Sequence, residues 1–291
     1  MSPNLTALVE ALRPKQWTKN AVVFAAIVFD GQLFEWDALA VVAISALLFS
    51  LTSSAGYLFN DLRDLDADRQ HPVKQHRPIA AGRLDARTAW IAMALIYAVV
   101  FPISFFLSPW FAGVLLIYVL LMLAYSRWLK NFVILDVFVI ASGFVLRVVG
   151  GAVVVDIPIS PWLYVCTVLL ALFIGFAKRR HELSILDGGA ANHRRNLANY
   201  SVELLDQFIL LVAAAALIAY SLYTFEAPAL PDDERMMLTI PFVVHGIFRY
   251  LYLVHQKGTG GAPEHLVLED RPLLLTVVLW GLVSVALLYG P

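Results

Sequence analysis

One charged stretch, "NDLRDLDADRQHPVKQHRP" from residue 60 onward, carries the side chains best suited to chemistry in this sequence. If a helix continues through it, a rotation of about 100° per residue places four oxygen-bearing side chains on one face, those of Asn60, Asp61, Asp64 and Asp68. Asp66 then points to the opposite face. Clustered carboxylates repel one another unless a cation lies among them. Oxygen ligands of this kind suit Mg²⁺, which usually keeps several waters and is shared with substrate phosphates. The spacing therefore predicts a magnesium site.

The same stretch also has a simpler interpretation. Arg63 and Arg69 lie among the aspartates and could neutralise a solvated acidic helix end without any metal. The metal site is the favoured hypothesis, because the spacing coincides with the edge of an apolar segment.

A second charged group stands in "GFAKRRHEL", where Lys178, Arg179 and Arg180 precede Glu182. Lys178 and Glu182 are four residues apart and share one helical face. Arginine offers a planar fork to phosphate oxygens, and lysine offers a point charge. The group is predicted to bind phosphate, although three basic residues at a helix end also serve as a simple membrane anchor.

Long apolar runs must position both groups. The chain has 291 residues, of which 60% are hydrophobic and 15% charged, and its mean hydropathy is +0.75. This composition is outside the range of soluble domains. Runs of roughly 20 apolar residues are long enough to cross a bilayer. Nine such spans are expected, at about 20–35, 38–59, 88–107, 110–126, 133–155, 161–177, 207–225, 237–254 and 273–289. Asp30 and Gly31 interrupt the first one, and one membrane domain over residues 1–291 is the simplest organisation.

Basic residues predict the orientation of these spans. Of the 21 lysines and arginines, 18 fall in alternate connecting segments, namely 1–19, 60–87, 127–132, 178–206 and 255–272. Cytoplasmic loops carry such an excess. We therefore expect a multi-pass protein of the cytoplasmic (inner) membrane, with the N-terminus and both charged groups on the cytoplasmic side.

The motif N-D-x-x-D-x-x-x-D, formed by Asn60, Asp61, Asp64 and Asp68 after the second span, resembles the signature of the UbiA superfamily of intramembrane prenyltransferases. The "HRPIAAG" segment also fits. The resemblance covers essentially the whole chain. It implies an all-α integral membrane fold, with nine transmembrane helices around a central cavity and cytoplasmic polar caps. It also implies that these four residues hold Mg²⁺, with Mn²⁺ as a substitute, against a substrate diphosphate.

Most superfamily members carry a second D-x-x-x-D pair where this chain has "KRRHE". That replacement, with "LRPKQWTKN" and "ILDVFVIASGFVLRVVGG", resembles the decaprenyl-phosphate phosphoribosyltransferase branch. The branch joins a polyprenyl phosphate to C1 of phosphoribosyl pyrophosphate (PRPP) and releases pyrophosphate, in the synthesis of arabinose-donor precursors for cell walls. The residues predicted to act in catalysis are Asp61, Asp64, Asp68, Lys178 and Glu182.

Two phosphorylated substrates need cations besides a metal. The candidate substrate-binding residues are Lys15, Lys19, Asn60, Lys74, Arg77, Tyr125, Lys130, Arg179 and Arg180. Tyr125 and Lys130 could equally be interfacial anchors. Asp136 and Arg147 lie within apolar runs, where a charged residue is a functional candidate by default. A structural pairing is favoured for Arg147, and Asp136 could also pair with Lys130 or Arg127.

Two other functions remain open. One is a prenyltransferase of the same superfamily that joins a polyprenyl diphosphate to an aromatic acceptor, which the missing second acidic pair disfavours. The other is a transporter of phosphorylated lipid or metabolite, but transporters usually bury charge near the membrane midplane. No nucleic-acid partner is expected, and self-association into a homo-oligomer is compatible with the sequence.

Overall fold

The computed structural model describes residues 3–185, 197–227, 230, 233–258 and 263–290. In this part of the chain helices are joined by turns and loops, and there are no strands. Eight helices are long and apolar enough to cross a membrane. They are α3 Trp36–Arg63, α5 Ala86–Leu107, α6 Pro109–Arg127, α7 Leu135–Val153, α8 Pro161–Ile185, α10 Val202–Glu226, α11 Ile240–Gln256 with the preceding η5 Arg235–Thr239, and α13 Arg271–Tyr289. The predicted all-α membrane fold is confirmed.

The first predicted span, 20–35, is not one continuous helix, and the count of nine is not confirmed. After α1 Pro3–Leu12, the chain forms a 3₁₀ helix, η1 Pro14–Phe24, and then the short α2 Ala25–Phe29. The turn that follows contains Gly31 at φ +80°, which glycine adopts without a Cβ clash. Polar packing explains the irregular start, because Asn20 is buried in η1 and hydrogen-bonds inside the bundle.

Local sequence signals define several helix starts. Ser108 caps α6 by accepting a hydrogen bond from the Phe111 amide, with Pro109 in the first turn. Asp85, Ser201 and Asp270 cap α5, α10 and α13 in the same way. Such caps satisfy amides that have no partner inside the helix.

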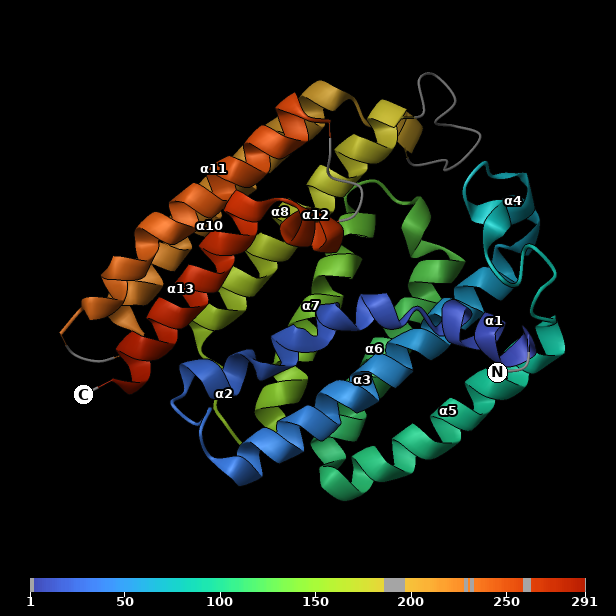
Figure 1. Ribbon diagram of the computed structural model, residues 1–291, viewed down its shortest axis with the longest axis horizontal. Coiled ribbons are helices and arrows are strands. Elements are labelled where there is room, and N and C mark those ends of the chain that lie inside the picture. Colours follow the sequence, from blue (N-terminus) through green and yellow to red (C-terminus); the bar gives the residue numbers. More distant parts are fainter. Residues whose placement is uncertain (1–2, 186–196, 228–229, 231–232, 259–262, 291) are drawn as a thin grey trace.

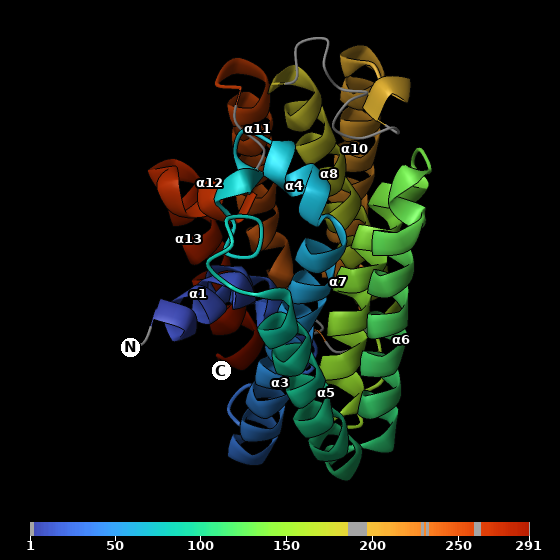
Figure 2. The ribbon, with the colours of Figure 1, turned by 90° about the vertical axis from the view of Figure 1, so that its right-hand side faces the viewer.

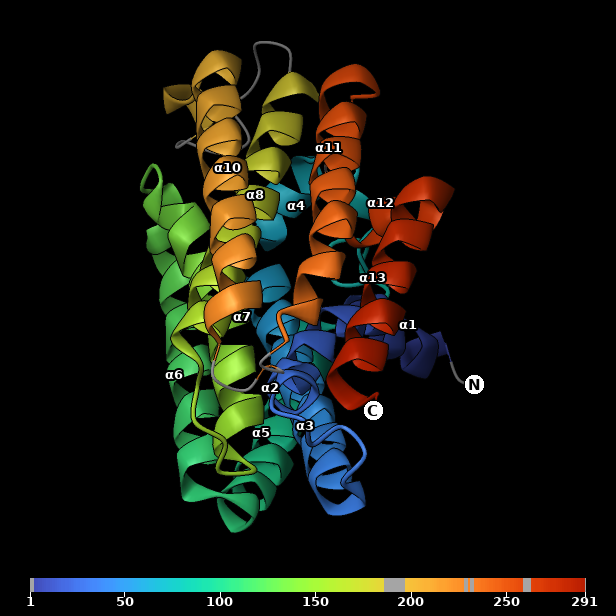
Figure 3. The same ribbon diagram turned by 90° about the vertical axis from the view of Figure 1, so that its left-hand side faces the viewer.

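The helices form two halves that share α7 (Figure 1). On one side, apolar residues of α7, α8, α10 and α11 pack together around Phe173, Phe176 and Leu205. On the other, η1, α2, α3, α6 and α7 pack around Phe49 and Phe111. In Figure 3, α10, α11 and α13 lie in front of α7 and α8.

Close contact of η1 with α7 depends on Gly151. A Cβ at this position would lie 1.8 Å from the carbonyl oxygen of Val23, so any larger residue would push η1 away from α7.

The segments rich in lysine and arginine meet at one end of the bundle. The C-terminal ends of α3 and α8 lie there together with α4 Leu65–Gln70 (Figure 2). A cavity of about 350 Å³ lies between the ends of α3, α5 and α6, outside the junction of the two halves. The predicted central cavity stays a prediction.

Candidate active site

The acidic face forms where α3 ends. Asp64 leaves the helical conformation at φ −90° and ψ 12°, and α4 Leu65–Gln70 begins at the next residue. The continuous helix assumed for the sequence is therefore broken. The Asp64 amide still donates to the Asn60 carbonyl at 2.9 Å, and the Asp68 amide donates to the Asp64 carbonyl at 2.8 Å. These bonds preserve the four-residue spacing across the break.

Solvent exposure separates Asp66 from Asp61 and Asp68, as the helical periodicity predicted. Asp61 and Asp68 are 2% and 3% exposed, whereas the Asp66 side chain is 95% exposed. Asp66 lies 3.7 Å from Arg69, and both point to solvent. The predicted separation of Asp66 from the other aspartates is confirmed.

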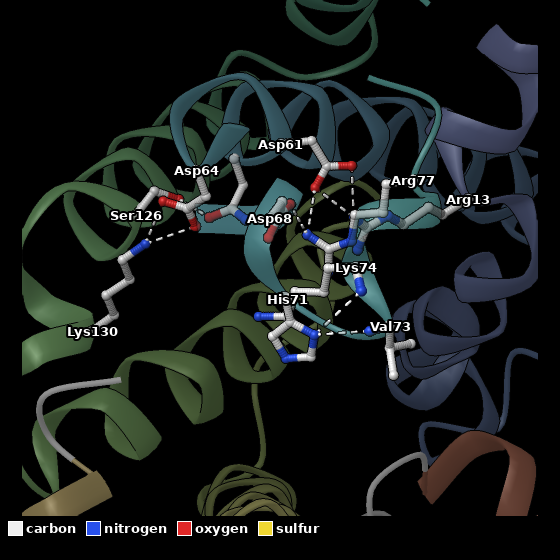
Figure 4. A network of polar contacts seen from close by, with 11 residues as sticks. Arg13, Asp61, Asp64, Asp68, His71, Val73, Lys74, Arg77, Ser126 and Lys130 are labelled. Atoms are coloured by element: carbon white, nitrogen blue, oxygen red, sulfur yellow. Dashed lines mark hydrogen bonds and ion pairs between the residues drawn. The ribbon is translucent and has the colours of Figure 1, made fainter. Parts of the chain in front are cut away.

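Arginines from two distant segments hold the buried aspartates (Figure 4). Arg13, between α1 and η1, donates from Nη2 to both carboxylate oxygens of Asp61, at 2.6 and 2.8 Å. Arg77 Nη1 donates to Asp61 at 3.0 Å and to Asp68 at 2.6 Å. Burying an unpaired carboxylate is costly, so these pairs stabilise the acidic face.

The remaining members of the motif face α6. Lys130 Nζ lies 2.8 Å from both carboxylate oxygens of Asp64. Ser126 donates to Asn60 Oδ1 at 3.2 Å. Lys130 was expected at the site, and the structure brings it there.

The simpler interpretation of the acidic stretch does not match these contacts. Arg69 pairs with the outward Asp66, and Arg63 donates to the backbone carbonyl of Arg127. The buried Asp61 and Asp68 are paired instead with Arg13, between α1 and η1, and with Arg77, between α4 and α5. The half-buried Asp64 is paired with Lys130, just after α6.

The donor set fits a hard divalent cation. Two carboxylates seven residues apart, those of Asp61 at the end of α3 and Asp68 on α4, converge on one positive atom, Arg77 Nη1. Oxygen ligands are the ones that Mg²⁺ prefers. Among the described residues, however, no three acidic, histidine or cysteine side chains come close enough to form a ready metal site. Asp64 would have to turn from Lys130 toward the other two.

The basic group at the end of α8 forms a second network. Arg179 is 2% exposed, and its Nε lies 2.9 Å from Asp136 Oδ2 on α7. It also pairs with Glu182 and lies 3.4 Å from the Tyr125 hydroxyl on α6. The predicted structural pairing of Asp136 is thus found, but its partner is Arg179 instead of Lys130 or Arg127.

Tyr200 completes this network from the segment before α10. Its hydroxyl donates to Asp136 Oδ1 at 3.0 Å and accepts from the Ile134 amide at 2.6 Å. Burial raises the pKa of Tyr200 to about 12. The hydroxyl therefore stays protonated and donating at neutral pH.

The other members of the basic group have different surroundings. Arg180 pairs with Asp206 on α10 and donates to the Val254 carbonyl. Lys178 is half-buried near the end of α8. The protein pairs of Arg179 and Arg180 give both a structural role, and phosphate binding by this group stays a prediction.

The last turn of α6 and the short 3₁₀ helix that follows it, η3 Leu129–Asn131, connect the two networks. Tyr125 reaches Arg179, the next residue Ser126 reaches Asn60, and Lys130 reaches Asp64. The acidic and basic groups therefore border the same short segment at one end of the bundle.

Three predicted substrate-binding lysines are not part of these networks in the contacts described above. Lys15 is exposed on η1, and Lys19 is half-buried further along it. Lys74 begins η2 Lys74–His76 beside the acidic group, where its amide donates to His71 Nδ1 at 3.3 Å (Figure 4).

Arg13 is the main residue that sequence reasoning missed. It precedes Pro14 and lies 48 residues from Asp61, so no local spacing connects the two. Its left-handed backbone, at φ 53° and ψ 58°, and its stacking 4.9 Å from the Tyr57 ring position the guanidinium. The sequence signals were its basic charge in a segment expected at the same membrane face and its place in "LRPKQWTKN", which carries the family resemblance.

Arg147 lies deep in the bundle, away from both charged groups. Its guanidinium donates to Asn20 Oδ1 at 2.6 Å, to the Gly143 carbonyl at 2.7 Å, to Tyr118 at 3.0 Å and to Ser53 at 3.1 Å. These bonds tie η1 to α3, α6 and α7. The structural role favoured from the sequence is confirmed.

An all-helical membrane bundle with an Asn–Asp motif at the end of α3 defines a class of intramembrane transferases. Residues 21–263 match the UbiA prenyltransferase family, and the chain belongs to that family.

Similar proteins indicate the branch of the family to which the chain is related. The chain is 33% identical over 300 residues to the decaprenyl-phosphate phosphoribosyltransferase of Mycolicibacterium smegmatis, covering 98% of this chain and 94% of that protein. It is 34% identical over 281 residues to the protein of the same name from Corynebacterium glutamicum, covering 94% and 84%. The branch suggested by "KRRHE" is therefore confirmed.

Solved structures share the fold. A UbiA homolog from Archaeoglobus fulgidus bound to GPP and Mg²⁺ superposes with a TM-score of 0.75 at 15% identity, over 97% of this chain and 99% of that one. The apo structure of a UbiA homolog from Aeropyrum pernix gives a TM-score of 0.64 at 16% identity, over 91% and 97%.

Proposed function

We propose that this protein transfers the 5-phosphoribosyl group of PRPP to a polyprenyl phosphate of the decaprenyl-phosphate type and releases pyrophosphate. A bond forms between C1 of the ribose and an oxygen of the lipid phosphate, while the bond from C1 to pyrophosphate breaks. The product would serve arabinose-donor and cell-wall precursor synthesis. The observation that carries the proposal is the basic group of α8, which stands where other superfamily members have a second acidic pair. Full-length similarity to phosphoribosyltransferases supports it.

The acidic group is the proposed binding site for the PRPP diphosphate. Asn60, Asp61, Asp64 and Asp68 would hold Mg²⁺, with Mn²⁺ as a substitute. A divalent ion there would stabilise the negative charge of the departing pyrophosphate. Solved family members with Mg²⁺ support the use of a divalent metal in this fold.

The cations around the acids are proposed to bind phosphate oxygens. Arg13, Arg77 and Lys130 already converge on the acidic group and offer N–H donors from three directions. Fixed donors aimed at developing negative charge stabilise a transition state without reorganising.

The lipid phosphate needs little activation. A phosphate oxygen is already anionic at neutral pH, so no strong general base is required. Lys178 is the proposed cation for the second phosphorylated substrate, and Lys178 and Glu182 are proposed to act in catalysis. Arg179 then acts by fixing the end of α8 through its buried pair with Asp136.

The proposed setting is the cytoplasmic membrane, with the N-terminus and the site on the cytoplasmic side. The excess of basic residues in the segments at this end supports the orientation. PRPP is highly charged, so a site open to the aqueous cytoplasm suits it.

Two parallel reactions test the proposal against its alternatives. Purified protein receives radiolabelled PRPP with polyprenyl phosphate in one reaction, and radiolabelled polyprenyl diphosphate with 4-hydroxybenzoate in the other. The expected result is label entering the lipid in the first reaction and no labelled prenylated benzoate in the second. Prenylated benzoate without ribosylated lipid would establish the prenyltransferase alternative. No turnover, with transfer of phosphorylated lipid across vesicles, would establish the transporter.

A further inference from the structure

Two arginines at the end of α3 and α6 have a different environment from the other arginines at this end of the bundle. Arg63 Nη2 donates to the backbone carbonyl of Arg127 at 3.1 Å, and both side chains are exposed. In the part of the chain that the structure describes, neither forms an ion pair with an acidic side chain. Arginines that do form such pairs include Arg13, Arg69, Arg77, Arg83, Arg179, Arg180 and Arg249.

These two arginines border an apolar hollow. The cavity of about 350 Å³ between α3, α5 and α6 is lined by Phe59, Leu62, Leu65, Ala86 and Trp90, with Arg63 and Arg127. Phe59 and Trp90 meet edge to face at 6.1 Å between ring centroids. One molecule could therefore meet an apolar wall and two guanidinium groups at the same time.

The hollow lies on the exposed side of α3, away from the buried Asp61. Arg63 follows Asp61 by two residues, so their side chains leave α3 about 200° apart. Asp61 is buried on the inner side, whereas Arg63 is exposed on the outer side. α5, which provides Trp90, is the least buried of the eight candidate spans. A phosphate held by Arg63 and Arg127 would thus lie outside the proposed reaction site.

We propose that this hollow binds an anionic phospholipid of the membrane, whose phosphate contacts Arg63 and Arg127 and whose acyl chain packs on Phe59 and Trp90. Arginine binds phosphate through paired N–H donors, and the apolar lining matches a lipid chain. The bound lipid would connect α3 to the last turn of α6, which also carries Ser126 and leads to Lys130. This inference does not depend on the proposed reaction.

Quenching of Trp90 fluorescence measures occupancy directly. The full-length protein is placed in nanodiscs of phosphatidylcholine and titrated with phosphatidylglycerol that carries bromine on its acyl chain. The chain has seven tryptophans, so the signal of Trp90 is the difference between wild type and Trp90→Phe. Brominated phosphatidylcholine, inorganic phosphate and polyprenyl phosphate are tested in parallel as an uncharged lipid, a free anion and a substrate lipid.

Phosphatidylglycerol is expected to quench Trp90 at lower mole fraction than phosphatidylcholine. Arg63→Gln and Arg127→Gln should each weaken this preference by about tenfold or more, the cost of a charge-assisted hydrogen bond. Arg69→Gln, an exposed arginine of the same region that does not line the hollow, should leave it unchanged.

Three outcomes would overturn the inference. Equal quenching by both brominated phospholipids would remove the role of the arginines. Equal effects of Arg63→Gln and Arg69→Gln would reduce it to general surface charge. Displacement of phosphatidylglycerol by inorganic phosphate or, preferentially, by polyprenyl phosphate would assign the hollow to a different ligand.

Discussion

Asp68→Asn, compared with Asp66→Asn, tests the acidic group most directly. The two residues stand on one short helix, and the substitution is the same. Asp68 is buried and bonded to Arg77 at 2.6 Å, whereas Asp66 points to solvent. Any difference in activity between the two variants is therefore caused by the different positions of the two carboxylates.

The expected magnitudes follow from these environments. If Asp68 helps to hold a divalent ion against the leaving pyrophosphate, removing its charge forfeits several kcal/mol of transition-state stabilisation. A loss of about 3 kcal/mol corresponds to roughly a hundredfold lower kcat/KM or more. The exposed pair of Asp66 contributes little, so Asp66→Asn should change kcat/KM by less than about fivefold.

Stability must be separated from activity in this comparison. Asp68→Asn also weakens the binding of the Arg77 guanidinium, which costs about 1.5–3 kcal/mol for a hydrogen bond to a charged group. Arg77 keeps its bond to Asp61 in this variant, so the folded protein should lose stability but not its fold. Initial rates with radiolabelled PRPP and thermal unfolding in detergent are the two measurements. Equal losses for Asp66→Asn and Asp68→Asn, in folded protein, would refute the reasoning.

The remaining predictions concern the metal, the basic group, Tyr200 and the topology. EDTA should abolish turnover, and Mg²⁺ or Mn²⁺ should restore it; activity that survives exhaustive chelation would contradict the metal site. Lys178→Ala should raise the KM of one phosphorylated substrate by about 10- to 150-fold. Arg179→Ala should mainly lower the melting temperature, because it leaves Asp136 buried without its cation. A large KM effect for Arg179→Ala together with a lower melting temperature for Lys178→Ala would contradict these two roles. The pKa of Tyr200 is raised in the folded protein to about 12. The hydrogen bond from its hydroxyl should therefore stabilise the fold fully below the ordinary tyrosine pKa of about 10 and lose this effect as pH rises through about 12. A stability difference between wild type and Tyr200→Phe that falls already at neutral pH would contradict this. In a Cys166→Ser background, a cysteine at position 70 should react only from the cytoplasmic side and one at position 230 only from outside; reaction of both from one side would overturn the orientation.

The acidic group shows how charge is balanced at this end of the bundle. Asp61, Asp64 and Asp68 each face a lysine or arginine from another segment. Each of these carboxylates is held in place by a charged hydrogen-bond partner, which orders its side chain. The same cations would become available to phosphate oxygens whenever the carboxylates turn to a metal.

Sequence periodicity and length determined most of the fold. Eight of the nine predicted spans correspond to long apolar helices, because a run of about 20 apolar residues has one stable form in a bilayer. The first span was wrong as a continuous helix. Its buried Asn20 bonds with Ser50 and Arg147, and these tertiary contacts hold the segment as a 3₁₀ helix followed by the short α2.

The separation of Asp66 from the other aspartates also followed from the sequence alone, because Asp61, Asp64 and Asp68 are related by the helical repeat and Asp66 is not. The type of charge at the end of α8 likewise identified the branch of the family. Local patterns of this kind survive folding, since they depend on spacing within one helix.

Only the tertiary structure decided which charges meet. Arg13 reaches Asp61 from 48 residues away, and Arg179 turns inward to Asp136 instead of outward to solvent. Arg63 was a candidate partner of the acidic face, yet it lies on the opposite side of α3 beside Arg127. Pairing between helices depends on how they pack, and composition or periodicity within one helix carries no information about the residue that faces it across the bundle.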